Sequence, residues 1–421
     1  MAAGLILRRG GASAGGPDEP GPCARRFSCV AVSVGARPPG GARPCHHDDV
    51  STVRPRRVGP AAASPGAGRL SGGRAGRREP AVSFAGLTSS GLLFAGLLAA
   101  AAVVATIVGT GATESPPVTG LLSPGPVVQF GIPVARALLD LGAVATVGVA
   151  LLARLVGFDR PERTEPVMRR ARRAGLWASV LWTVSALVSI VLLTAELNPG
   201  AVPTPGAVWS YVSNIAAGKG LMLSAACGLV SVWLARLTIR HGESVPAELR
   251  AGVGLFGLLP LPLTGHASDW SYHDLGMVSM ELHVVGATAW AGSLGAVIVF
   301  LSRRTDLLAE AVPRYSKLAT WCVFVVGFTG LFNGLMELGL SPVTSLPSSL
   351  WTTRYGVLVL TKAVLIAVIA AIAIVVRTRL LPQIAAGRRT AVAVWCGWEL
   401  IVLSLAFGVA VVLTRVPVTP F

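Results

Sequence analysis

The sequence has little of what a soluble protein needs at its surface. Charged residues make up only 13% of its 421 residues and aromatic residues only 6%, whereas hydrophobic residues make up 52%. The mean hydropathy is +0.65. A soluble domain carries about twice this share of charge, because its surface has to face water. An ordinary soluble domain is therefore excluded.

Familiar catalytic and metal motifs are also missing. The six cysteines include no pair at the short spacing of a zinc or redox motif, so disulfides are not indicated. No nucleophile–base pair and no phosphate-binding glycine loop occurs in a suitable context. We therefore expect that the protein is not an enzyme. Cys227, Cys322 and Cys396 lie inside apolar runs, where a free thiol is usually a small hydrophobic group, although a metal role is the alternative.

Long apolar runs dominate the chain after residue 85. A bilayer core is crossed by about 20 helical residues, whereas strands of a membrane barrel run about 10 residues and alternate in polarity. The sequence therefore predicts an all-α fold, a polytopic transmembrane helix bundle with about nine spans. We place the spans at Gly86–Val108, Phe130–Leu152, Leu176–Ala195, Gly218–Ala235, Ala251–Gly265, Gly276–Leu301, Leu318–Leu340, Tyr355–Val376 and Ala391–Thr414.

Arginine and lysine are distributed unevenly between the loops. Alternate loops carry 18 of these cations, and the opposite loops with the C-terminal tail carry 3. Because cytoplasmic loops are enriched in Lys and Arg, we expect a cytoplasmic N-terminus, with Phe421 outside. The net charge of +16 then faces anionic lipid headgroups, so the partner is the lipid bilayer and not nucleic acid. The predicted location is the plasma (inner) membrane, with multiple passes.

The first 80 residues differ from the rest of the chain. They are rich in Gly, Ala, Pro and Arg without hydrophobic periodicity, which is typical of disorder. We expect a disordered cytoplasmic tail over residues 1–80 and a transmembrane domain over residues 81–421. Two alternatives stay open: translated sequence upstream of the true start, or a metal-binding segment formed by CHHDD at Cys45–Asp49 with Cys23 and Cys29.

Soft donor side chains cluster around the fifth and sixth apolar runs. The fifth run is short and interrupted by Pro260 and Pro262, and broken spans of this kind often mark substrate sites in transporters. Imidazole and thioether groups bind copper well: the mixed set suits Cu(I), whereas histidines with aspartates suit Cu(II). These residue types also occur at membrane interfaces without any ligand. We predict a copper site at the outer face, formed by His266, His273, His283, Met277 and Met280.

Four ionisable residues lie inside the predicted spans. Arg136 and Asp140 are one turn apart on the second span, so we expect a local ion pair. Lys362 and Glu399 lie inside the eighth and ninth spans. A charge at bilayer depth costs about 2.5–3.5 kcal/mol, so these two residues are expected either to pair or to form a relay that carries protons or cations inward.

Small residues recur every four positions in the sixth span, at Ala287, Ala291 and Gly295. Such a stripe lets two helices approach closely. We therefore expect it to mark a helix–helix contact, with no chemistry implied.

Six segments resemble the CopD copper-resistance family, in the order in which that family has them. They are TGHA at Thr264–Ala267, ELHVVGATAWAGSLG at Glu281–Gly295, RYSKLA at Arg314–Ala319, TGLFNG at Thr329–Gly334, YGVLVLTKAVL at Tyr355–Leu365 and WELIVLSLAFGVAVVLTRVP at Trp398–Pro417. The part from Pro124 to Leu237, with RALLDLGAVATVGVALLARL, is similar to the amino-terminal part of actinobacterial members. Those members are often fused to a CtaG-type cytochrome c oxidase assembly module.

The resemblance implies copper transport, commonly described as uptake into the cytoplasm, with a CopC-like extracytoplasmic copper carrier as partner. Because no second module precedes Phe421, we expect any oxidase-assembly role to involve a CtaG-type protein in trans. We hypothesise that His266 and His283 capture copper and that Lys362 with Glu399 set the polarity of the inner path. The alternatives are a copper-delivery factor that transports nothing and, less favoured, a haem-binding membrane redox protein.

Overall fold

The computed structural model describes residues 86–114, 123–157, 160–264, 273–341, 344–385 and 391–418, and within these ranges it contains helices and no strands. The all-α prediction is confirmed. The predicted tail, residues 1–80, and the CHHDD segment lie outside the described residues. The helices are α1 (Gly86–Ala112), α2 (Pro126–Val156), α3 (Pro161–Leu197), α4 (Pro205–Asn214), α5 (Ala216–His241), α6 (Ala247–Phe256), α7 (His273–Leu301), α8 (Thr305–Leu340), α9 (Ser349–Thr352), α10 (Arg354–Val375), α11 (Leu381–Ala385) and α12 (Val392–Leu413).

Several helices begin at residues suited to a helix start. Pro126, Pro161 and Pro205 open α2, α3 and α4, where a missing N–H costs no intrahelical hydrogen bond. The hydroxyl of Thr204 accepts from the backbone N–H of Ala207 at 3.2 Å. That of Thr353 accepts from Gly356 at 2.9 Å at the start of α10. These caps satisfy N–H groups that a helix start leaves without partners.

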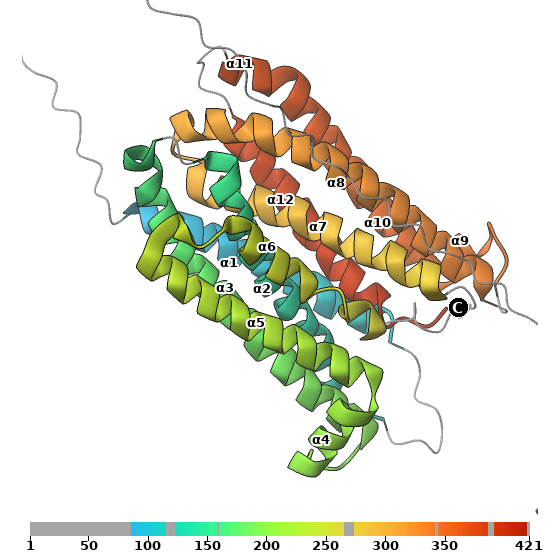
Figure 1. Cartoon of the computed structure of the whole chain (residues 1–421). Helices are drawn as coiled ribbons and strands as arrows, with labels where there is room; N and C mark the ends of the chain where they lie inside the picture. The colour runs from blue at the N-terminus through green and yellow to red at the C-terminus, as the bar shows by residue number, and fades with distance from the viewer. Residues whose placement is uncertain are drawn as a thin grey trace, which may run out of the picture. The chain divides into compact units, whose positions relative to one another are not determined.

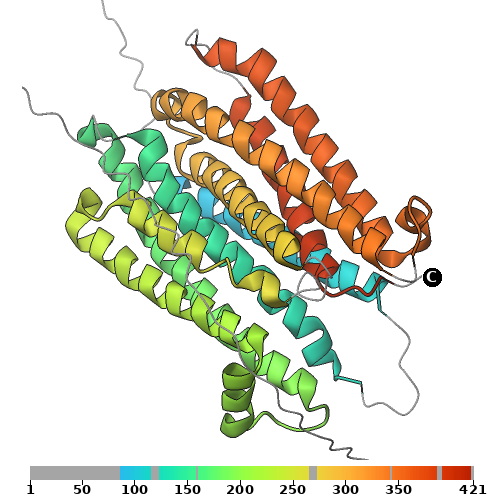
Figure 2. The same ribbon diagram turned by 45° about the vertical axis from the view of Figure 1, so that its right-hand side comes forward.

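Eight helices in the described ranges are long and apolar enough to cross a membrane: α1, α2, α3, α5, α7, α8, α10 and α12. The fifth of the nine predicted spans, Ala251–Gly265, is not among them, and it is interrupted as its two prolines predicted. There α6 ends at Phe256, and a turn leads to a 3₁₀ segment, η2, at Leu261–Thr264. Pro260 and Pro262 have no N–H to continue a hydrogen-bond ladder. Together α6 and η2 run from the end of the bundle where α5 stops toward the end where α7 begins (Figures 1 and 2).

Helices α2 and α7 touch through glycines at the centre of the bundle. A Cβ atom on Gly148 of α2 would lie 2.1 Å from the carbonyl oxygen of Gly292 of α7, and one on Gly292 would lie 2.4 Å from the carbonyl oxygen of Val144. The predicted stripe of small residues is on α7, but the close contact with α2 uses Gly292, which is not part of that stripe. A Cβ on Gly295 of the stripe would meet only a Leu400 methyl carbon, at 3.9 Å. This close approach brings α7 into the centre of the bundle.

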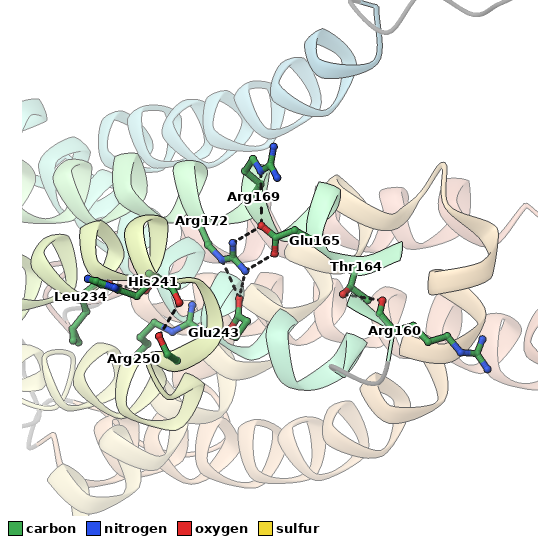
Figure 3. Close-up of polar contacts among 11 residues, drawn as sticks. Arg160, Thr164, Glu165, Arg169, Arg172, Leu234, His241, Glu243 and Arg250 are labelled. Atoms are coloured by element: carbon green, nitrogen blue, oxygen red, sulfur yellow. Dashed lines mark hydrogen bonds and ion pairs between the residues drawn. The ribbon is translucent and has the colours of Figure 1, made fainter. Parts of the chain in front are cut away.

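A network of charged side chains, in which the two arginines are buried, joins α3, the short 3₁₀ segment η1 (Gly242–Ser244) and α6 (Figure 3). The guanidinium of Arg172 donates to both carboxylate oxygens of Glu165 at 2.9 Å and to Glu243 Oε1 at 2.9–3.0 Å. Arg250 donates to the other oxygen of Glu243 at 2.9 Å. Arg172 is only 5% exposed and Arg250 8%. Burial lowers the pKa of Arg250, and the neighbouring Glu243 carboxylate opposes that change. The network ties the start of the broken crossing to α3.

Replacing Gly148 with Ala should destabilise the bundle, because the added methyl group collides with the backbone of α7. We expect a loss of about 1–3 kcal/mol, the usual cost of overpacking, seen as a lower unfolding temperature of the detergent-purified protein. Gly252→Ala is the control, since nothing lies within 4 Å of a Cβ at that position. Equal unfolding temperatures for the two variants would contradict the glycine contact.

Replacing Arg172 with Ala should lower stability by about 1.5–3 kcal/mol, because it removes the charge-assisted hydrogen bonds from a buried guanidinium to Glu165 and Glu243. Arg154→Ala is the matched control: its ion pair with Glu248 is 63% and 59% exposed, and exposed pairs contribute little. Thermal unfolding of both variants in detergent measures the difference. If Arg172→Ala unfolds at the temperature of the control, the network does not hold α6 to α3.

Candidate functional site

Polar side chains from α7, α8 and α10 meet at His283. The ring atom Nδ1 lies 3.0 Å from the hydroxyl oxygen of Thr329 on α8. The other ring nitrogen, Nε2, lies 3.4 Å from the ammonium nitrogen of Lys362 on α10. Thr329 is buried, and His283 and Lys362 are half-buried. The imidazole is therefore contacted on both sides within the bundle.

The contacts of Thr329 define the proton position on His283. The hydroxyl of Thr329 donates to the carbonyl oxygen of Val325 at 2.6 Å. Because a hydroxyl has one hydrogen, its oxygen is left to accept from Nδ1–H of His283. Nε2 then carries the lone pair and accepts from the ammonium of Lys362. A neutral imidazole whose other nitrogen is held by a protein group is the form that binds metal ions.

A glycine lets the imidazole ring lie close to α8. A Cβ on Gly330 would stand 3.0 Å from Cε1 of His283 and 3.4 Å from Nδ1. That separation is tighter than side chains normally allow, so a larger residue would push the ring away from Thr329. Gly330 thus preserves the hydrogen bond that holds the ring.

Met280 contacts the same face of α8 one turn before His283. Its sulfur lies 3.8 Å from the side-chain nitrogen of Asn333, and Asn333 follows Thr329 by one turn. The side-chain oxygen of Asn333 is buried and has no hydrogen-bond partner in the described ranges. The thioether and the imidazole therefore share one interface, next to an amide oxygen that is free to accept.

The other predicted donors do not converge on this point. His273 begins α7, and ten residues of helix rise about 15 Å along the axis. His273 and His283 of the predicted outer-face site therefore lie at different depths along α7. Met277 is half-buried between them, and His266 lies outside the described residues. Among the residues that the structure describes, no three His, Cys, Asp or Glu side chains gather closely enough to hold a metal ion.

Of the four predicted ionisable residues, two form an ion pair with each other and the other two do not. Nε of Arg136 donates to both carboxylate oxygens of Asp140 at 3.2 Å, which confirms that ion pair. No ion pair joins Lys362 to Glu399 in the described part of the chain, because Lys362 contacts His283 instead. Glu399 is 4% exposed on α12.

Glu399 is surrounded by side chains in the interior of the bundle. It lies near Trp290 of α7 and Tyr315 of α8. The indole nitrogen of Trp290 and the hydroxyl oxygen of Tyr315 are buried near the Glu399 carboxyl, and neither makes a hydrogen bond of normal geometry within the described residues. Glu399 is therefore surrounded by buried polar groups of α7 and α8.

Two residues of the site were not predicted from the sequence. Thr329 and Asn333 are polar, stand one turn apart and lie within an apolar helix, and each contacts a predicted donor on α7. Their spacing inside TGLFNG was the signal that could have identified them, because polar residues one turn apart share a helix face.

The fold and this interface define the class: a polytopic α-helical membrane protein with nitrogen and sulfur donors inside its bundle. Residues 127–273 match the family model described as copper resistance protein D-like, N-terminal domain. Residues 309–413 match the model described as copper resistance protein D. Together the two matches cover more than half of the chain, which belongs to the copper resistance protein D family.

The chain is also similar to one characterised relative. The copper transport protein CutJ of Bacillus subtilis (strain 168) is 26% identical over 230 residues, which are 53% of this chain and 36% of that protein. The chain thus spans about a third of the length of that relative. No solved structure matches the chain. Thr329, Asn333 and Lys362 lie inside a family match, whereas Met280 and His283 lie between the two matched ranges.

Replacing Thr329 with Val should destabilise the protein by about 1–2 kcal/mol, because Nδ1–H of His283 loses its acceptor in a buried place. Thr329→Ser keeps the hydroxyl and is the control. The unfolding temperature in detergent is the measurement. An unfolding temperature of Thr329→Val equal to that of the unaltered protein would show that the hydrogen bond contributes no stability.

Proposed function

We propose that this protein carries copper across the plasma (inner) membrane, inward to the cytoplasm, and so contributes to copper homeostasis and resistance. One observation carries the proposal: in a bundle of the copper resistance protein D family, His283 and Met280 of α7 both face α8 in its interior. Imidazole and thioether are donors that copper prefers.

The donors on α7 suit transfer in steps. His273, Met277, Met280 and His283 follow one another along the helix, with rises of about 4.5–6 Å between neighbours and within about 120° of one face. A row of weak sites lets an ion enter and leave, whereas one closed site would retain it. We propose that His273 and His266 meet the ion at the predicted outer end and that His283 is the innermost donor.

The chemistry of this row favours Cu(I). Thioether sulfur is a soft ligand and selects Cu(I) over harder divalent ions. Asn333 lies beside Met280, and its side-chain oxygen has no hydrogen-bond partner among the described residues. We propose that this oxygen adds a polar contact for the ion next to the thioether. Beyond His283, the buried carboxyl of Glu399 is the next acidic group that we propose for the inner path.

Delivery at the outer end fits an extracytoplasmic copper carrier of the CopC kind, and a CtaG-type protein in trans is a candidate recipient. The arginine-rich loops place the N-terminus of the predicted topology in the cytoplasm. That orientation puts the start of α7 outside, where the ion would enter.

His283→Ala should reduce Cu(I) flux into proteoliposomes by at least about tenfold, because it removes the one imidazole of the interior site. The purified full-length chain is reconstituted, and copper inside the vesicles is measured over time. His241→Ala, which removes an exposed histidine at the end of α5, is the matched control and should keep the flux of the unaltered protein.

Three outcomes bear on the proposal. Flux that depends on His283 supports it. Unchanged flux in His283→Ala rejects the site. Copper binding by the unaltered protein without any flux rejects transport and favours a delivery factor for oxidase assembly.

A further inference from the structure

The position that copper would take on His283 is already occupied by a group of this chain. The lone pair on Nε2 faces the ammonium of Lys362 at 3.4 Å. A nitrogen lone pair serves either a hydrogen-bond donor or a metal ion, and not both at once. We propose that Lys362 is a built-in competitor, whose ammonium holds Nε2 until copper displaces it and returns when copper leaves. This inference rests on the proposed copper transport.

The two partners of the ring differ in how firmly they are held. Thr329 holds Nδ1 at 3.0 Å, its own hydroxyl is bonded within α8, and Gly330 admits the ring. Lys362 reaches Nε2 from α10 on a flexible stem of four methylene groups, at the long limit of a hydrogen bond. When copper arrives, the imidazole therefore stays in place and the ammonium moves.

The exchange leaves the charge at Nε2 unchanged. One N–H···N hydrogen bond breaks and one copper–nitrogen bond forms, with no electron and no proton transferred. Ammonium and Cu(I) each carry a single positive charge, so the presence of both would be repulsive. Within the described ranges Lys362 has no ion pair with any carboxylate. No described carboxylate therefore holds its ammonium beside His283.

Competition of this kind weakens binding and speeds release. A transporter gains from both, because a site that binds too tightly stops the flow of ions. A Lys362 that only packed against His283 would instead stabilise the fold without affecting the metal. Measurements of Cu(I) affinity and of Cu(I) flux therefore distinguish a competitor for copper from a residue that only stabilises the fold.

The test compares Cu(I) affinities of the full chain in detergent, measured by competition with a bathocuproine chelator under reducing conditions. In Lys362→Leu, which adds no metal-binding group, Cu(I) affinity should rise roughly tenfold, the factor that corresponds to loss of a charge-assisted hydrogen bond, while flux in proteoliposomes falls. Lys362→Arg retains a cationic donor and should stay near the unaltered protein. Lys219→Met removes an exposed lysine at the start of α5 and should change neither quantity.

Unchanged or weaker Cu(I) binding in folded Lys362→Leu would overturn the competitor role, even where binding still depends on His283. Lys362→Ile gives the same comparison if the Leu variant does not accumulate. Absence of Cu(I) binding by the unaltered chain would overturn the proposed function and this inference together. Cu(I) binding by the unaltered chain, without tighter binding in the Lys362 variant, would therefore reject the competitor role and leave the proposed function standing.

Discussion

A polar group inside a lipid bilayer has to find its partner within the protein, because no water is available there. The positions of the ionisable residues of this bundle follow from that constraint. Arg136 has Asp140 one turn away, and His283 and Lys362 satisfy each other across two helices. In the first case opposite charges cancel. The second pairs a cation with a neutral ring, and such a pair is easier to separate, which is why function is expected there.

The packing of α7 determines which of its residues lie inside. The glycine contact with α2 draws α7 into the centre, and its far side then meets α8, where Thr329 and Asn333 stand. Neither contact depends on metal-binding residues. Together they orient Met280 toward Asn333 and His283 toward Thr329. Because a backbone contact cannot be adjusted by side-chain movement, this orientation is well defined, as a site that discriminates between ions requires.

Much of the architecture followed from composition and periodicity. Apolar runs of membrane length predicted the helices, and two prolines predicted the interruption near Pro260, although the interrupted fifth span was counted among nine and eight helices of membrane length are described. The Arg136–Asp140 pair could be predicted because both residues lie on one helix, where spacing alone fixes proximity. The partner of Lys362 could not, because His283 lies 79 positions away and pairs between helices depend on rotations that a sequence does not display.

The sequence by itself determined the class of protein, the helices, the donor types on α7 and the family, because these depend on local composition and order. Only the tertiary structure decided that Thr329 holds the imidazole and that Lys362 faces its free nitrogen. The physical reason is that packing between helices joins residues that look unrelated in the sequence, whereas the rise along one helix, which separates His273 from His283, follows from spacing alone.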